Sequence, residues 1–136
     1  MHVRRSAQHG LTVAGIAAVL LLAPGCRPAP RHAVTLDLAW RVVPDPPKVG
    51  PIRVELTLTD PATGRPVAGA RVRVEADMSH PGMRPVFSAA REVGAGRYAA
   101  PLDLTMAGDW ILLLEADLPD ARSWQGQVEL PGVRPE

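Results

Sequence analysis

Sulfur and imidazole side chains gather in one short segment of this sequence. Met78, His80 and Met83 fall within six consecutive residues, although the chain beyond its first 26 residues has only three methionines and two histidines. Pro81 and Gly82 lie between them and favour a tight turn, which would let the three side chains converge. Thioether sulfur and imidazole nitrogen form a soft ligand set that suits Cu(I). The pattern therefore indicates a candidate copper site.

Met106 is a candidate fourth ligand, because it opens the turn Met106-Ala107-Gly108 before an apolar strand. Ligation by Met106 requires that this turn and the segment around His80 lie at the same end of the fold. Methionine is also a common filler of gaps in hydrophobic cores, and a histidine in a Pro-Gly loop is often only solvated. Copper ligation and core packing therefore remain alternative interpretations of these residues.

Alternation of apolar and polar residues dominates the sequence from residue 34 onward, which is the period of half-buried strands. Clusters of turn-forming residues separate the alternating runs, and no segment has the pattern of an amphipathic helix. About seven short strands with this spacing predict an all-β fold, an immunoglobulin-like β-sandwich of antiparallel strands. The predicted strands cover residues 34–42, 52–59, 70–77, 86–91, 97–103, 109–117 and 123–130.

Two segments carry more specific expectations. Residues 44–51 contain four prolines, which lack amide donors, so we expect an exposed loop there. Residues 109–115 are apolar on both faces of a strand, which predicts a central strand with Trp110 in the core. Trp40 and Trp124 are further candidate core residues.

The N-terminus resembles the signal peptide of a bacterial lipoprotein. Arg4 and Arg5 precede an apolar run over residues 11–23, which is followed by the small residues that lead to Cys26. A run of about 13 residues is shorter than the ~20 needed to cross a bilayer, which favours a cleaved leader over a permanent anchor. Cys26 stands directly after Gly25, as in a lipobox, where the cysteine is lipidated. The alternative is simple secretion with a free thiol on Cys26.

These features predict the organisation of the whole chain. We expect a signal peptide over residues 1–25, a lipidated Cys26 with a Pro-rich tether over residues 26–33, a sandwich domain over residues 34–131 and a short tail over residues 132–136. The N-terminal lipid would hold the protein to a membrane in the cell envelope, in the periplasm or on the outer surface. A single cysteine cannot form a disulfide within the chain, so stability must come from packing.

Charge and motif content argue against two classes of function. The chain has 15 basic and 14 acidic residues, which implies no nucleic-acid partner. Arginines at positions 53, 71, 73 and 91 are interspersed with glutamates, which is typical of an ordinary solvated surface. His80 is the only histidine beyond the tether, and there are no paired carboxylates, phosphate loop or zinc spacing, so we expect no enzymatic activity.

The order of several motifs resembles the YtkA-like domains, a family related to the FixH proteins of cytochrome oxidase assembly. The resemblance covers residues 47–117. It rests on the Pro-x-x-Gly segment over residues 47–50, on Gly-Arg-Pro-Val-Ala-Gly-Ala-Arg-Val over residues 64–72, on the methionine-containing loop, on Gly96-Arg97-Tyr98 and on Ala107-Gly108-Asp109-Trp110. The resemblance implies an extracytoplasmic β-sandwich with a role in metal handling or oxidase assembly. His80 and Arg84 stand where that family commonly has small residues or methionine.

Three hypotheses follow for function. The first is a copper-binding accessory protein that works with a membrane oxidase or a copper transport protein. The second is a metal-free interaction module of an envelope or transporter complex, which presents loops or an edge strand to its partner. The third is a carrier of a small ligand, which requires an apolar cavity.

Overall fold

The computed structural model describes residues 30–78 and 80–136. The predicted leader over residues 1–25, the predicted lipidation site Cys26 and residues 27–29 of the predicted tether lie outside the described residues. Within the described part, no helix is long and apolar enough to span a bilayer.

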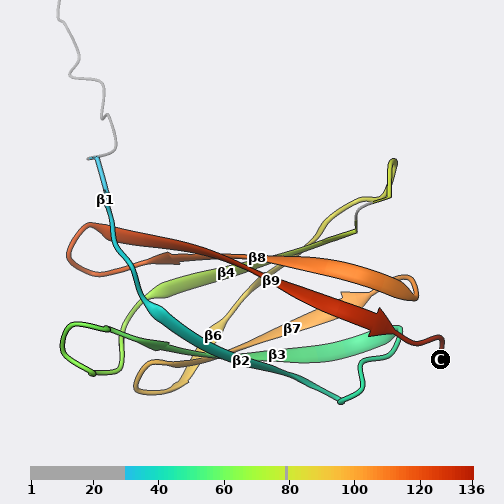
Figure 1. The fold of residues 1–136 in the computed structure, drawn as a ribbon, viewed down its shortest axis with the longest axis horizontal. Helices are drawn as coiled ribbons and strands as arrows, with labels where there is room; N and C mark the ends of the chain where they lie inside the picture. Colours follow the sequence, from blue (N-terminus) through green and yellow to red (C-terminus); the bar gives the residue numbers. More distant parts are fainter. Residues whose placement is uncertain (1–29, 79) are drawn as a thin grey trace, which may run out of the picture.

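The described residues form an all-β sandwich of two sheets, which confirms the predicted fold class (Figure 1). One sheet has the strand order β1-β9-β8-β4-β5, and the other has the order β2-β3-β7-β6. All paired strands are antiparallel except β1 and β9. The strands are β1 (His32–Ala33), β2 (Asp37–Val43), β3 (Gly50–Thr59), β4 (Arg71–Met78), β5 (Val86–Ala89), β6 (Arg91–Gly94), β7 (Arg97–Leu104), β8 (Gly108–Asp117) and β9 (Arg122–Val133).

The described residues contain nine strands instead of about seven, for two reasons. The single strand predicted over residues 86–91 is divided, because the chain leaves one sheet and enters the other there. β5 pairs with β4, whereas β6 pairs with β7 in the opposite sheet. In addition, His32 and Ala33, which we placed in the tether, pair in parallel with Arg122 and Ser123 of β9.

The core lies between the two sheets and is built by the inward-facing residues of each strand. Trp110 is buried, and its strand β8 lies between β4 and β9, which confirms the predicted central strand. Trp124 is also buried, and Trp40 is half-buried against the core. Among the described residues 30–78 and 80–136, all buried hydrophobic residues lie between Leu36 and Val133, so residues 27–136 include the whole core that the structure describes.

The proline-rich segment is only partly the exposed loop that we predicted. Pro44 and Pro46 are exposed, but Pro47 is buried, and its carbonyl oxygen accepts a hydrogen bond from the backbone nitrogen of Arg134. Pro51 belongs to β3, opposite Asp103 of β7. This is possible because Pro51 lies near the start of the strand, before the first residue of β3 that pairs with β2, and prolines are tolerated at such positions.

The strand register of the five-stranded sheet shows which residues lie at each end of the sandwich. β4 and β8 are antiparallel, with Arg71 opposite Asp117 at one end and Met78 opposite Trp110 at the other. β1 lies beside the start of β9, so the chain enters the fold at the end that contains Asp117. The β4–β5 loop lies at the opposite end, as Figure 1 shows. Seven residue steps along β4 separate the two ends by about 24 Å.

A group of ion pairs holds the segment around β1 against the rest of the sandwich. Arg31 pairs with Asp117, whose side chain is only 13% exposed and is also approached by Arg71 and Arg73. The hydrogen bond from Arg31 is the largest of the effects that lower the pKa of Asp117. The segment around β1 is thus held by backbone pairing and by an ion pair at the same place.

Candidate functional site

Met78 ends β4 and points into the end of the core. The inward-facing residues of β4 alternate with exposed ones, and Met78 is the last of the inward set, with 6% of its surface exposed. Its methyl carbon Cε lies 3.1 Å from the position that a Cβ on Gly108 would occupy. Met78 is therefore packed directly against the β7–β8 turn.

Met106 lies in that same turn and is 47% exposed. The indole Nε1 of Trp110 donates a hydrogen bond of 3.0 Å to the carbonyl oxygen of Met106, which anchors the turn to the core. Because Met78 contacts Gly108, two residues further along, Met78 and Met106 occupy the same end of the sandwich. The condition that we set for Met106 as a ligand is thus met for this pair.

His80 and Met83 flank a Pro-Gly turn beyond the end of β4. Gly82 has a φ of +87°, the conformation that the third position of a type II turn requires, and Pro81 suits the position before it. Such a turn brings the Cα atoms of its first and fourth residues within about 7 Å of each other. His80 is exposed, whereas Met83 is half-buried and packs against the core.

The structure thus places the four predicted ligands at the same end of the sandwich, in two segments. Met78 and Met106 are joined through the β7–β8 turn, and His80 and Met83 through the Pro-Gly turn. No group of three or more His, Cys, Asp or Glu side chains within residues 30–78 and 80–136 is placed to hold a metal ion. The soft donors among the described residues at this end are the methionine sulfur atoms, which fit Cu(I).

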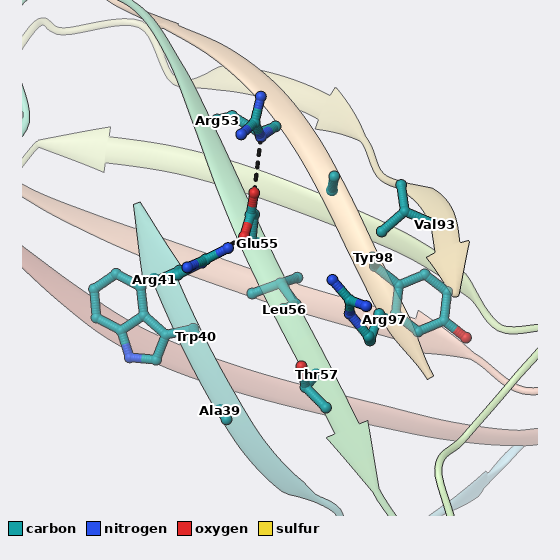
Figure 2. A pocket seen from close by; sticks show the side chains of 11 residues that line it. Ala39, Trp40, Arg41, Arg53, Glu55, Leu56, Thr57, Val93, Arg97 and Tyr98 are labelled. Carbon is teal, nitrogen blue, oxygen red and sulfur yellow. Dashed lines mark hydrogen bonds and ion pairs between the residues drawn. The ribbon is translucent and has the colours of Figure 1, made fainter. Parts of the chain in front are cut away.

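A second feature, on the outer face of the four-stranded sheet, was not predicted. A hollow of about 490 Å³ lies over β2, β3 and β7. Figure 2 shows Arg41, Arg53 and Arg97 among the side chains that line it. Glu55 lies among them and accepts hydrogen bonds from Nε of Arg41 and, at 3.0 Å, from Nε of Arg53. Both hydrogen bonds lower the pKa of Glu55, and the one from Arg41 has the larger effect.

The sequence did not predict this hollow, because Arg53 and Arg91 were grouped with Arg71 and Arg73 as parts of an ordinary solvated surface. In the structure, Arg53 and Arg91 face outward from the four-stranded sheet, whereas Arg71 and Arg73 lie on the five-stranded sheet. Arg71 and Arg73 join the acidic cluster around Asp117 and form an ordinary network of ion pairs. Only the strand register shows which arginines are neighbours.

Gly96, in one of the motifs that resemble the YtkA-like domains, allows two turns to meet. Its φ is +70°, and a Cβ there would lie 2.6 Å from Cβ of Pro66 and 2.9 Å from the carbonyl oxygen of Leu58. Both distances are too short for a side chain. Glycine at this position therefore allows the β6–β7 turn to approach the β3–β4 loop.

Tyr98 fastens the same loop from inside the core. Its buried hydroxyl donates a hydrogen bond of 2.6 Å to the carbonyl oxygen of Val67 and accepts one of 3.1 Å from the backbone nitrogen of Ala70. Burial raises the pKa of Tyr98. These motif residues serve the architecture, at the end of the sandwich opposite Met78.

Comparison with known proteins agrees with this arrangement of motifs. The sequence profile of the YtkA-like family matches residues 36–115, which begins earlier than the resemblance we identified. No curated protein gives a significant match. No solved structure gives one either. The matched region covers more than half of the chain and spans β3, β4 and β7, together with the whole methionine-containing loop. This protein therefore belongs to the YtkA-like family.

Proposed function

We propose that this YtkA-like β-sandwich is a lipid-anchored accessory protein of the cell envelope that binds Cu(I) with Met78, Met83, Met106 and His80. The observation that carries the proposal is the packing of Met78 against the turn that contains Met106. Met78 and Met106, from distant parts of the chain, lie at one end of the fold, beside the loop that supplies the other two candidate ligands.

The donor set and its exposure suit the transfer of copper to a partner. Met78 is buried and held by the core, whereas Met106 and His80 are accessible at the surface. Rigid strands and an anchored turn would position the sulfur atoms, and the exposed ligands would be free to exchange the metal with another protein. Thioether ligands favour Cu(I) over hard cations, so bound copper would stay in the reduced state.

The position of the predicted anchor is compatible with such a role. The described chain begins at the end of the sandwich that contains Asp117, and the candidate ligands lie about 24 Å away along β4. A lipid on Cys26 would therefore leave the methionines directed away from the tether. A membrane oxidase or a copper transport protein is the partner class that we propose.

The proposal is tested by anaerobic Cu(I) titration of residues 27–136 against a chromogenic competitor. A Met78→Leu, Met83→Leu, Met106→Leu variant removes the sulfur atoms and keeps apolar side chains of similar volume, so the core should stay folded. We expect one copper per wild-type molecule, and at least a hundredfold weaker binding by this variant. Equal affinities of the two proteins would exclude the methionines as ligands.

His80 is tested separately, because it is exposed and its removal should not disturb packing. His80→Asn should weaken Cu(I) binding roughly tenfold at pH 7.5, since an amide does not replace the imidazole nitrogen as a copper donor. An affinity of His80→Asn equal to that of the wild type would remove His80 from the ligand set.

A metal-free interaction module is the second candidate, and a surface feature favours it. Phe87, the only phenylalanine of the chain, is 70% exposed on the edge strand β5. It lines a hollow on the outer face of the five-stranded sheet together with Leu113. An exposed aromatic residue on an edge strand is a feature of partner-binding surfaces. Absence of Cu(I) binding by the wild-type protein would favour this function over the first.

A further inference from the structure

The outer face of the four-stranded sheet concentrates arginines that the proposed copper function does not use. In one row across the strands, Arg41 lies opposite Glu55, which lies opposite Ala99, which lies opposite Arg91. In the next row, Arg97 lies opposite Thr57. Long side chains in adjacent rows of a sheet reach one another.

Arg53 completes the group, because it lies on β3 two residues before Glu55 and on the same face. This group thus has four arginines around one carboxylate, a local excess of three positive charges, whereas the whole face has an excess of one. Other acidic residues of this face, Asp37 and Asp103, lie at its two ends.

Glu55 orients two of these arginines and leaves their terminal Nη donors unused. Each of its carboxylate oxygens accepts a hydrogen bond from one Nε atom, Oε2 from Arg41 and Oε1 from Arg53. Glu55 is largely covered, with 22% of its side chain exposed, whereas Arg41 and Arg53 are 70% and 54% exposed. Within the described residues, the terminal Nη groups of both arginines donate no hydrogen bond. Their unused donors are thus available at the surface.

Arg97 and Arg91 form no ion pair with any described residue. Arg97 lies beside the hollow, as Figure 2 shows, together with Arg41 and Arg53. The hollow exists because the residues at its base, Ala39 and Ala99, are small. Its volume of about 490 Å³ falls in the range of small-ligand sites.

We propose that this hollow binds a compact oxyanion with two negative charges, of the phosphate or phosphate-monoester type, between Arg41, Arg53 and Arg97. The planar guanidinium group presents parallel donors that match the oxygens of phosphate. The hydroxyl of Thr57 lines the same hollow and is a further donor. This site is separate from the methionines and does not depend on the copper proposal.

Isothermal titration of residues 27–136 with inorganic phosphate at pH 7.5 and low ionic strength tests the proposal. We expect saturable binding of one phosphate per molecule. Arg97→Gln should weaken it roughly tenfold, as should Arg53→Gln, since each removes a charge-assisted contact. Arg65→Gln is the matched control, because it removes the same charge from the exposed β3–β4 loop and should leave binding unchanged. Circular dichroism establishes that each variant is folded.

Two results would overturn the proposal. One is the absence of saturable phosphate binding by the wild-type protein. The other is an equal loss of affinity in Arg65→Gln and Arg97→Gln, since this would mean that only the net charge matters.

A second arm of the experiment distinguishes the source of the phosphate group. Vesicles with and without phosphatidic acid, whose headgroup is a phosphate monoester, are sedimented with residues 27–136, which lack the predicted lipidation site Cys26. Sedimentation that requires phosphatidic acid and Arg97, and that free phosphate reverses, would identify a lipid headgroup. Phosphate binding without sedimentation would identify a soluble phosphate ester.

Discussion

Replacement of Gly96 by alanine should destabilise the domain by about 2–5 kcal/mol, from two separate costs. A φ of +70° costs an alanine about 1–2 kcal/mol relative to glycine. The new Cβ would also meet Cβ of Pro66 at 2.6 Å and the backbone oxygen of Leu58 at 2.9 Å. Forcing a methyl group into a packed contact typically costs a further ~1–3 kcal/mol.

Gly64→Ala is the control that separates the two costs. Gly64 has a φ of +68°, almost the same as that of Gly96, but no atom lies within 4 Å of the position of its missing Cβ. The control should therefore show only the conformational cost of about 1–2 kcal/mol. The difference between the two variants measures the close approach of the β6–β7 turn to the β3–β4 loop.

Urea unfolding of residues 27–136, followed by circular dichroism, gives both free energies of unfolding. We expect the Gly96→Ala variant to unfold at a clearly lower urea concentration than the Gly64→Ala variant, with an unchanged slope of the transition. If the two free energies agree within ~0.3 kcal/mol, the turns do not meet as described, and the architectural role of this family motif would be refuted.

Two further predictions concern the same architecture. Tyr98→Phe removes the hydroxyl that joins Val67 to Ala70, and should lower the free energy of unfolding by about 1–3 kcal/mol, because both backbone groups lose a buried partner; an unchanged melting temperature would contradict this. Asp117 has a pKa lowered below its ordinary value of 3.8 in the folded protein, chiefly by the hydrogen bond from Arg31. Its contribution to stability is therefore present above about pH 4 and is lost as the pH falls through the lower folded pKa. In urea titrations between pH 5 and 2, the free energy of unfolding should fall less for Asp117→Asn than for the wild type. If it falls equally in the two proteins, the ion pair is refuted.

Local alternation was sufficient to predict the sandwich, because each strand buries one face. Residues 109–115 departed from alternation, and the reason is now visible. Ile111 and Leu113 on the outer face of β8 are half-buried, since the strand has neighbours on both sides. The prediction of a central strand was therefore correct on physical grounds.

The features that the sequence did not reveal depend on partners that are distant in the chain. The run over residues 86–91 contains no glycine or proline that would mark a break, yet β5 and β6 pair with strands of different sheets. The position at which the chain passes from one sheet to the other is determined by which strands are available as hydrogen-bonding partners. His32 and Ala33 were likewise missed, because two residues carry no periodicity and gain their pairing from β9.

The candidate sites likewise divide into features that are local in sequence and features that depend on strand register. Met78, His80 and Met83 were identified because they are close in sequence and share a type of chemistry. That Met106 belongs to the same end depends on the register that places Met78 opposite Trp110. The arginine hollow depends on register throughout, since Arg41, Arg53 and Arg97 come from three strands.

The most direct test of copper binding by the methionines is X-ray absorption at the copper edge on the one-to-one Cu(I) complex. The account predicts sulfur scatterers in the first shell, and the loss of part of that shell in Met78→Leu and in Met106→Leu. A first shell of only nitrogen and oxygen, or a sulfur shell that both substitutions leave unchanged, would contradict it.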